Sequence, residues 1–457
     1  MPAGRAFRLA LSALGTILVA GPAAAQQSQR CQFVIENVDR EGARIEVSPG
    51  VINYFAGGNV RFRCSNVAVR ISSDSVASYQ GTVVQFVGHV RYRDTTADIT
   101  ADFGTYFKDS DKWEARASPG RTVLLRNLKD GATLRGPSLD YFRAAPGLRP
   151  ESEMYADQRP TITIPVQDTV GPGGDPYVVV GDRVRTRGDD KVWSGGRVTI
   201  DRSDFRGRGD SLFLDSGTGS AAALIGRASM HREAADSFDL VGRRIDLQLD
   251  RKELTYVTAR DSARLQGTDL TLDGDVIGLD INRRQVEQTV AWGKTIRPLA
   301  LSSDYEIRGD SVAFDTPGQT LKEIRAFRSA WIGAKPDSGT GDRDWIAGDS
   351  VRATFVTRDS SGVKRPALDR IESRGAARAL YRFRQPGEKQ ASLAYNKADL
   401  IVVTMRLVGD SVTVDSVFAR GSVEGVHVQP VRLRADSAAT DSLRARADTV
   451  VRKPRTP

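Results

Sequence analysis

The feature that most constrains this chain is a short cue that recurs along it and is followed each time by alternating apolar and polar residues. Each copy places Gly-Asp-Ser before Leu or Val, and the copies begin at residues 209, 309, 348 and 409. Gly tolerates positive φ and the short polar side chains bond to their own backbone, so the triplet predicts a turn that ends the preceding strand. The alternation that follows, as in Val312–Asp315, has the period of a half-buried strand. Repetition of one turn-and-strand unit predicts a stacked β architecture.

A second cue, a Gly two residues before a small apolar residue, also recurs along the chain. It occurs at Gly58, Gly88, Gly196, Gly226, Gly375 and Gly421. The gap is 30 residues from Gly58 to Gly88, 30 from Gly196 to Gly226, and 46 from Gly375 to Gly421. A loose period favours long strands joined by variable hairpins over a strict solenoid coil.

The first 25 residues are typical of a secretory signal. Arg5 and Arg8 give the segment a positively charged start. The apolar stretch that follows, Leu9 to Ala20, is too short to span a bilayer, and three alanines ending at Ala25 form a small-residue cleavage site. We therefore expect cleavage after Ala25 and an exported chain. Its two cysteines, Cys31 and Cys64, are then expected to form one disulfide, because the compartment is oxidising and their number is even. A metal or nucleophile role lacks a neighbouring His or further Cys.

The composition divides the exported chain into segments. A Gly- and Pro-rich stretch cannot continue a strand ladder, and the end of the chain is polar and rich in Arg, Ala, Asp and Ser. We expect a signal peptide over 1–25, a first β unit over 26–169, a linker over 170–176, a second and longer β unit over 177–430, and a disordered polar tail over 431–457.

The formal net charge of the chain is +9, and removal of Arg5 and Arg8 leaves +7 (9 − 2). A basic exported protein favours acidic partners such as phosphorylated lipid head groups. The alternative is that charged residues only coat the outer face. Nucleic acid is not expected as a partner, because export separates the protein from it and no nucleic-acid module is present.

No pattern in the sequence indicates an active site. The three histidines, His89, His231 and His427, are far apart, which does not favour a metal site. Neither a nucleophile elbow nor a phosphate-binding loop is present. Turn bonding explains the recurring Asp residues. We therefore expect a protein that is not an enzyme and that needs no metal or cofactor.

Several of these residues match a known pattern. Gly58-Asn59-Val60 and Gly88-His89-Val90 begin strands, and the segment Thr96–Asp102 leads to Tyr106. This arrangement resembles the OstA-like (organic solvent tolerance) family, which includes the periplasmic bridge proteins of lipopolysaccharide transport. The resemblance is clearest over 50–145 and is repeated more loosely over 195–430. Two departures are the greater length and the lack of the C-terminal barrel of the outer-membrane member.

The resemblance implies an all-β fold: a tandem or extended jellyroll of stacked antiparallel strands, shaped like a taco shell, with an apolar groove between two sheets. It further implies a periplasmic lipid-binding bridge or scaffold for outer-membrane assembly. Its ligand would be lipopolysaccharide or another acylated anionic glycolipid, and its protein partners would be other jellyroll proteins joined by edge-strand addition. Association with the outer membrane stays open.

Alternation assigns candidate residues to the two faces of the first unit, because side chains in a strand point alternately to opposite sides. The expected groove lining is Val60, Phe62, Val84, Phe86, Val90, Tyr92, Ile99 and Phe103. The expected basic rim is Arg61, Arg63, Arg91 and Arg93. The apolar set could instead fill an ordinary core, which is the commoner fate of such residues. Two other functions stay open: a structural or adhesive β-solenoid, and a carbohydrate-active β-helix enzyme.

Overall fold

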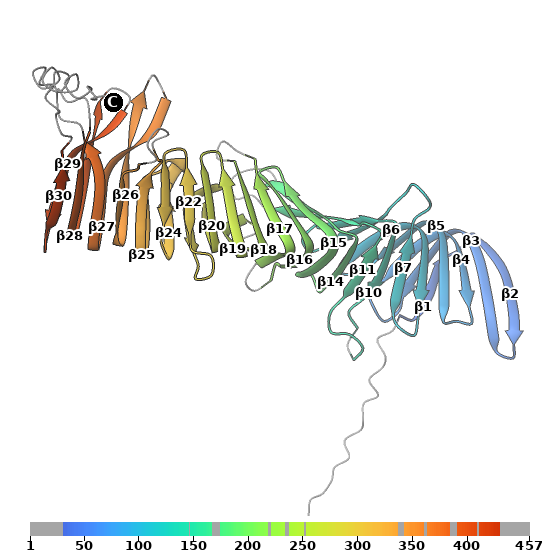
Figure 1. The fold of residues 1–457 in the computed structure, drawn as a ribbon. Coiled ribbons are helices and arrows are strands. Elements are labelled where there is room, and N and C mark those ends of the chain that lie inside the picture. Colours follow the sequence, from blue (N-terminus) through green and yellow to red (C-terminus); the bar gives the residue numbers. More distant parts are fainter. Residues whose placement is uncertain are drawn as a thin grey trace, which may run out of the picture. The chain divides into compact units, whose positions relative to one another are not determined.

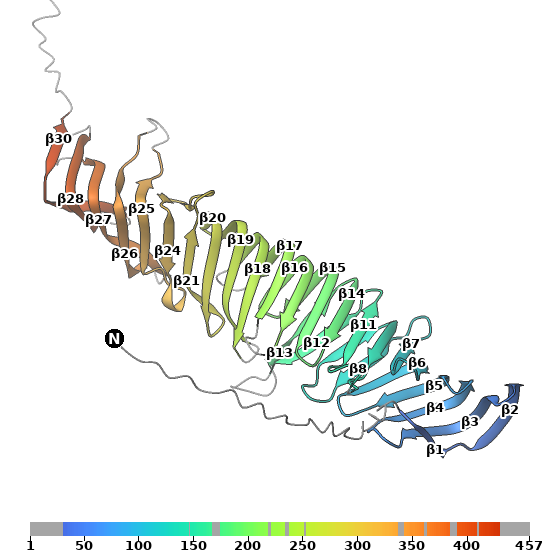
Figure 2. The ribbon, with the colours of Figure 1, turned by 90° about the horizontal axis from the view of Figure 1, so that it is seen from below.

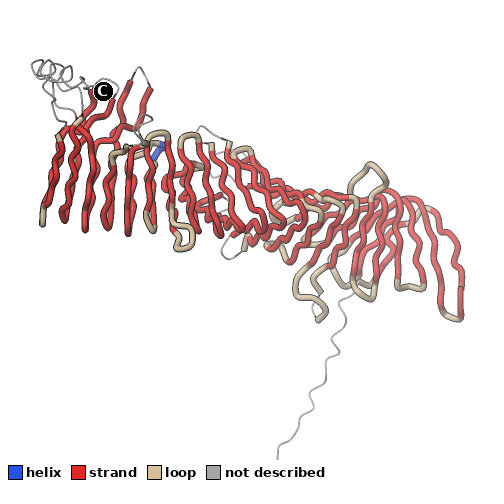
Figure 3. The backbone as a smooth tube through the Cα atoms, viewed as in Figure 1, coloured by secondary structure: helices blue, strands red, loops and turns tan. Residues whose placement is uncertain are grey.

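The computed structural model describes residues 31–429, apart from residue 146 and the segments 167–173, 218–220, 234–236, 251–252, 337–341, 361–362, 384–390 and 409–410. The expected signal peptide and the tail over 431–457 therefore lie outside the described residues. Within these limits the chain is all-β, as predicted: thirty strands and a short 3-10 turn, η1 (Pro317–Gln319), account for its regular structure (Figure 3). None of the described segments forms a helix long and apolar enough to cross a membrane.

The strands gather into two compact units. Unit 1 extends to Gly120 and includes Asp140–Glu153, and unit 2 comprises Arg121–Leu139 and the chain from Met154 onward. The strands of unit 1 are β1 (Phe33–Asn37), β2 (Arg40–Ser48), β3 (Val51–Cys64), β4 (Arg70–Tyr79), β5 (Val83–Arg93), β6 (Ala97–Phe107), β7 (Lys112–Arg116) and the end of β10 (Ser138–Phe142). β3 pairs with β1, β2 and β4, and the order continues through β5, β6 and β7, always antiparallel.

Unit 2 contains most of the strands (Figure 1). They are β8 (Val123–Asn127), β9 (Thr133–Gly136), β11 (Glu153–Asp157), β12 (Thr161–Val166), β13 (Gly174–Val180), β14 (Arg183–Arg187), β15 (Lys191–Arg202), β16 (Phe205–Asp215), β17 (Ala221–Arg232), β18 (Phe238–Asp250), β19 (Glu253–Gly267), β20 (Leu270–Asn282), β21 (Gln285–Trp292), β22 (Leu299–Ser302), β23 (Tyr305–Arg308), β24 (Ser311–Asp315), β25 (Glu323–Ala334), β26 (Trp345–Ser360), β27 (Val363–Phe383), β28 (Ser392–Val408), β29 (Ser411–Arg420) and β30 (Glu424–Val428).

The Gly- and Pro-rich stretch 170–176, expected to link two domains, falls inside unit 2. Its residues 170–173 lie outside the described residues, and Gly174 already begins β13. The flanking strands β12 and β13 pair antiparallel, with Ile164 opposite Tyr177. Turn-forming residues at this position therefore connect two neighbouring strands of one unit, which composition alone does not distinguish from a domain linker.

Both recurring sequence cues meet at one structural feature, a corner inside a strand. In β17, Gly226 and Arg227 have φ of 75° and 46°, and the register with β16 shifts between Arg208 and Ser211. A Cβ atom on Gly226 would lie 2.5 Å from Oδ2 of Asp210, and Arg227 donates to Oδ1 of Asp210 at 2.6 Å. The Gly-Asp-Ser cue and the Gly-x cue thus form two sides of the same corner.

The expectation that each Gly-Asp-Ser triplet ends a strand is wrong for two copies. Residues 209–211 lie inside β16, and residues 348–350 lie inside β26. The reason is that the Asp packs against a glycine of the next strand, which supports a bulge within the sheet instead of a chain reversal. This close Gly–Asp contact occurs at Gly58 with Asp39, Gly88 with Asp74, Gly196 with Asp182, Gly226 with Asp210, Gly375 with Asp349 and Gly421 with Asp399.

The corners divide the strands of unit 2 into two sheets, called here sheet A and sheet B. In β17, Ala221–Ile225 belongs to sheet A and Ala228–Arg232 to sheet B. The segments of β16 and β18 that pair with these residues belong to the same two sheets. β21, β24 and β29 pair within sheet A, and β22, β23 and β30 within sheet B. Figures 1 and 2 both show β15 to β20 side by side. Apolar side chains from both sheets, such as Leu224 and Leu240, are wholly buried between them.

Candidate functional site

Seven of the eight residues expected to line a groove in unit 1 form a filled core. Val60, Val84, Phe86, Val90 and their partners on this face are buried. The aromatic rings contact one another: Phe62 lies 5.5 Å from Phe86, and the Trp113 ring lies 5.7 Å from Phe86. The other buried members of the set are Phe62, Tyr92 and Ile99. Side chains packed in this way leave the predicted lining closed to solvent.

Phe103, the eighth residue, was expected to face inward, and this is wrong: it is 43% exposed. A corner in β5 is the cause. Phe103 pairs with Val87 and Ala101 pairs with Val90, so the two residues between Val87 and Val90 face only one residue of β6. Beyond this corner Asp102 faces inward instead of Phe103, because an extra residue in a ladder shifts the alternation of faces.

The four expected rim arginines lie on the outer face of unit 1, and carboxylates already engage three of them. Arg91 donates to Asp98 through Nε at 2.8 Å and Nη2 at 2.5 Å. Arg93 lies 3.9 Å from Asp98, and Arg63 pairs with Glu36 at 3.2 Å. The fourth, Arg61, donates to the side chain of Asn59. These carboxylates neutralise much of the positive charge of the four rim arginines.

The two cysteines form a disulfide between the segment before β1 and the end of β3, with a Cα–Cα distance of 5.1 Å. Both cysteines are buried. Phe33 of β1 pairs with Cys64 in the ladder, so the disulfide reinforces a strand pairing already present. Its role in the structure is to hold the beginning of unit 1 in place.

An open groove occurs instead in unit 2, between sheets A and B at strands β23 to β29. Its volume is about 540 Å³. Apolar and aromatic residues from both sheets line it, which shows that it lies between them. Sheet B contributes Ile332, Ala334, Ile346, Ala379, Leu380, Tyr381 and Phe383, and sheet A contributes Leu368, Ile371, Val403, Met405 and Val414. We call this cavity the groove.

Polar groups gather where the groove meets solvent. Arg382 donates to Asp344 at 2.9 Å, and Arg406 pairs with Asp415 at 3.4 Å. The Tyr381 hydroxyl accepts a hydrogen bond from the side-chain amide of Asn396 at 3.0 Å. The groove therefore has an apolar floor and a mouth with polar groups of both charges, which suits a molecule with an apolar and a polar end.

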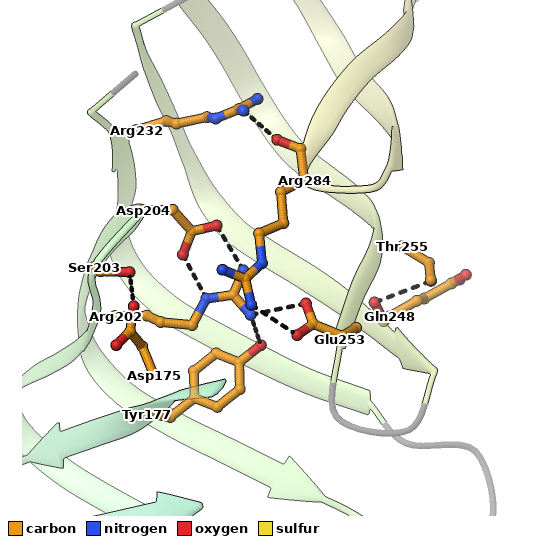
Figure 4. Close-up of polar contacts among 10 residues, drawn as sticks. All are labelled: Asp175, Tyr177, Arg202, Ser203, Asp204, Arg232, Gln248, Glu253, Thr255 and Arg284. Atoms are coloured by element: carbon orange, nitrogen blue, oxygen red, sulfur yellow. Dashed lines mark hydrogen bonds and ion pairs between the residues drawn. The ribbon is translucent and has the colours of Figure 1, made fainter. Parts of the chain in front are cut away.

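Closer to the middle of unit 2, a polar cluster joins the edges of the two sheets (Figure 4). The Arg202 side chain of sheet B is 1% exposed and lies 3.1 Å from Glu253 of sheet A. Arg202 also donates to the Tyr177 hydroxyl at 2.9 Å and to Asp204 at 2.6 Å, and Arg284 donates to Glu253 at 3.2 Å. We call these five residues the latch, because they connect the tips of sheets A and B.

Two residues of the latch, Arg202 and Asp204, keep their charges despite burial. Burial alone would lower the pKa of Arg202, but its hydrogen bond to Asp204 and the nearby acidic groups raise that pKa overall. Burial acts to raise the pKa of Asp204, and the Arg202 guanidinium outweighs this effect and holds it below its usual value. Burial raises the pKa of Tyr177 to about 12. At neutral pH Arg202 and Asp204 are therefore both charged, and the Tyr177 hydroxyl beside them is neutral.

Beneath the latch the interior is nearly filled. The remaining cavity there measures about 30 Å³, and apolar residues such as Ile200, Leu214 and Leu247 line it. The same two sheets thus enclose a packed core near the latch and an open groove towards β29. Across the described part of the chain, three or more His, Cys, Asp or Glu side chains nowhere gather in a way that could hold a metal ion.

A scan against family models and a search of the curated proteins found no match. Among solved structures, the chain is similar to the crystal structure of LptH, described as the LptA homologous periplasmic component of the lipopolysaccharide transport device from Pseudomonas aeruginosa. The identity is 19%, the match covers 26% of this chain and 84% of that chain, and the TM-score is 0.23. A TM-score this low carries no argument about function.

Proposed function

We propose that this chain is an exported lipid-binding protein that holds the acyl chains of an amphiphile in the groove of unit 2. It acts by binding, without a catalytic step. The amphiphile class is an acylated anionic glycolipid such as lipopolysaccharide, and the site of action is the periplasm. The sequence resemblance to the OstA-like family supports this ligand and location, and the groove supports the mode of binding.

The groove carries the proposal. Its volume of about 540 Å³ lies within the range of about 300–1,000 Å³ found for small-molecule sites. Each methylene moved from water into an apolar site contributes about 0.8 kcal/mol, so a single acyl chain supplies enough free energy for stable binding. The lining offers apolar contacts from two sheets, whereas the interior of unit 1 is filled with its own side chains.

Photo-crosslinking at two neighbouring residues of β27 tests the proposal. Ile371 lines the groove, whereas Arg370 is exposed on the opposite side of the same strand. A photo-reactive residue at Ile371 should capture an acylated lipid from an envelope extract, and one at Arg370 should not. Equal capture at both positions, or none at Ile371, would refute acyl binding in the groove.

Partner proteins are proposed to join by edge-strand addition, at β2 of unit 1. All nine residues of β2 are exposed, including Ile45 and Val47. Among the described strands, β2 pairs with β3 alone. An exposed edge of this length offers unpaired backbone groups to another strand.

A further inference from the structure

A second cavity, of about 600 Å³, lies on the outer face of sheet B. Arg297, Arg308, Trp331, Arg343 and Trp345 are among its lining residues, and we call it the outer pocket. In the ladder Arg308 pairs with Trp331. Their neighbours Ile307 and Ile332 are buried in the interior, so alternation directs Arg308 and Trp331 outward. Trp345, the first residue of β26, also lines the groove, so the outer pocket lies next to the groove.

The outer pocket has more positive than negative charge. Its three arginines face two carboxylates: Arg343 lies 2.8 Å from Glu306, Arg308 also pairs with Glu306, and Arg297 lies 3.5 Å from Asp310. One positive charge is therefore in excess. Each guanidinium has five N–H donors, so pairing with one carboxylate leaves donors available for an anion.

The indole of Trp331 holds two of these guanidinium groups in place. The Arg343 group lies 4.7 Å from the ring centroid, and the Arg308 group lies 5.4 Å from it. Cation–π contact of this kind orients an arginine without using up its hydrogen-bond donors. The donors are thus positioned before a ligand arrives, which reduces the entropy lost on binding.

We infer that the outer pocket binds the phosphorylated head group of the amphiphile whose acyl chains lie in the groove. The inference rests on the proposed function and adds a residue-level assignment of the head-group site. Arginine is suited to phosphate because its planar fork matches two phosphate oxygens at once. Because Trp345 lines both cavities, this head-group site lies next to the groove that holds the chains.

The variant Arg308→Gln tests this assignment and has a closely matched control. The Arg308 side chain is 57% exposed. Its partner Glu306 remains ion-paired with Arg343 when Arg308 is replaced. The Arg352 side chain is 58% exposed, and its partner Glu323 likewise remains ion-paired with Arg325 when Arg352 is replaced. Arg352 does not line the outer pocket. Arg352→Gln therefore removes an equivalent surface ion pair elsewhere in unit 2.

Binding of two fluorescent lipids with identical acyl chains, phosphatidic acid and diacylglycerol, provides the measurement. We expect Arg308→Gln to weaken phosphatidic acid binding roughly tenfold, the effect of losing one hydrogen bond to a charged group, and to leave diacylglycerol binding unchanged. Arg352→Gln should change neither. Equal affinity of the unmodified protein for both lipids, or equal loss of both in Arg308→Gln, would overturn the head-group site.

A soluble ligand separates failure of this site from failure of the acyl-binding function. If the protein binds neither lipid, the carrier function is refuted, and glycerol 3-phosphate is then titrated against tryptophan fluorescence. A response that Arg308→Gln abolishes supports the outer pocket, and no response overturns it. If inorganic phosphate gives the same response at the same concentration, the pocket is a site for free phosphate and the head-group assignment is wrong.

Discussion

Replacing a single corner glycine should destabilise unit 2 more than replacing a glycine with similar backbone geometry in open space. Gly226 has φ of 75°, and an added Cβ atom would lie 2.5 Å from Oδ2 of Asp210. Gly318 has φ of 60°, and no atom would come within 4 Å of its Cβ. Gly226→Ala therefore adds a steric conflict to the backbone penalty, and Gly318→Ala has the backbone penalty alone.

The magnitude follows from the two contributions. A left-handed backbone costs a non-glycine residue about 1–2 kcal/mol, and this applies to both variants. Forcing a methyl group against Asp210 adds about 1 kcal/mol or more, as overpacking does. The displaced Asp210–Arg227 pair is exposed, so its loss contributes under about 1 kcal/mol. We expect Gly226→Ala to lower the free energy of unfolding by about 2–4 kcal/mol and Gly318→Ala by about 1–2 kcal/mol.

Urea unfolding followed by circular dichroism, with hydrogen exchange at β16 and β17, measures the difference. The double variant Gly226→Ala/Asp210→Ala removes the carboxylate and should recover the steric part of the loss, leaving it close to Gly318→Ala. Equal destabilisation by Gly226→Ala and Gly318→Ala, or no recovery in the double variant, would show that contact with Asp210 does not select glycine at the corner.

Two further predictions concern the covalent and ionic links within each unit. Replacing Cys31 and Cys64 by Ser should lower the stability of unit 1 by about 3–4 kcal/mol, the loop-closure effect of a 33-residue separation; an unchanged thermal midpoint would contradict this. The pKa of Asp204 is lowered in the folded protein. Its pairing with Arg202 therefore stabilises the folded state at pH values above the ordinary pKa of Asp, and this stabilisation is lost as the pH falls through the lowered value. Asp204→Asn should therefore destabilise unit 2 more at pH 7 than at pH 3 in thermal melts, and a constant difference would refute the role of that ionised carboxylate.

The alternation of side chains predicted much of the fold, because period 2 is a direct consequence of strand geometry. Val84, Phe86, Val90 and Tyr92 all lie on one buried face, as expected. The alternation failed at Phe103, where a bulge moves the side chains to the other face. A bulge depends on the register between two strands, and register is a property of the pair that neither strand specifies alone.

The position of the groove could not be predicted in this way. The residues expected to line it were chosen where the sequence resemblance is clearest, and those residues form a filled core with aromatic rings 5–6 Å apart. Whether a space between two sheets is open depends on the summed volumes of side chains from strands far apart in the sequence. Leu368 and Ile332, for example, line the same groove although they come from strands that β26 separates in the ladder.

Small side chains at inward positions explain why the interior opens where it does. In sheet B of β27 and β28, four buried inward positions are alanines: Ala377, Ala379, Ala394 and Ala398. Counted from the corner glycines, Ala379 and Ala394 correspond to the larger residues Met230 and Phe238 near the latch, whereas Ala377 and Ala398 correspond to the small residues Ala228 and Gly242. The sheets cannot simply close over the smaller residues, because the corner at Gly375, with φ of 70° and Asp349 packed against it, constrains the strand. A bend of similar construction therefore encloses a packed core where side chains are large and a groove where they are small. The sequence feature that accompanies the groove is therefore alanine at the positions of Ala379 and Ala394, where the packed region carries Met230 and Phe238.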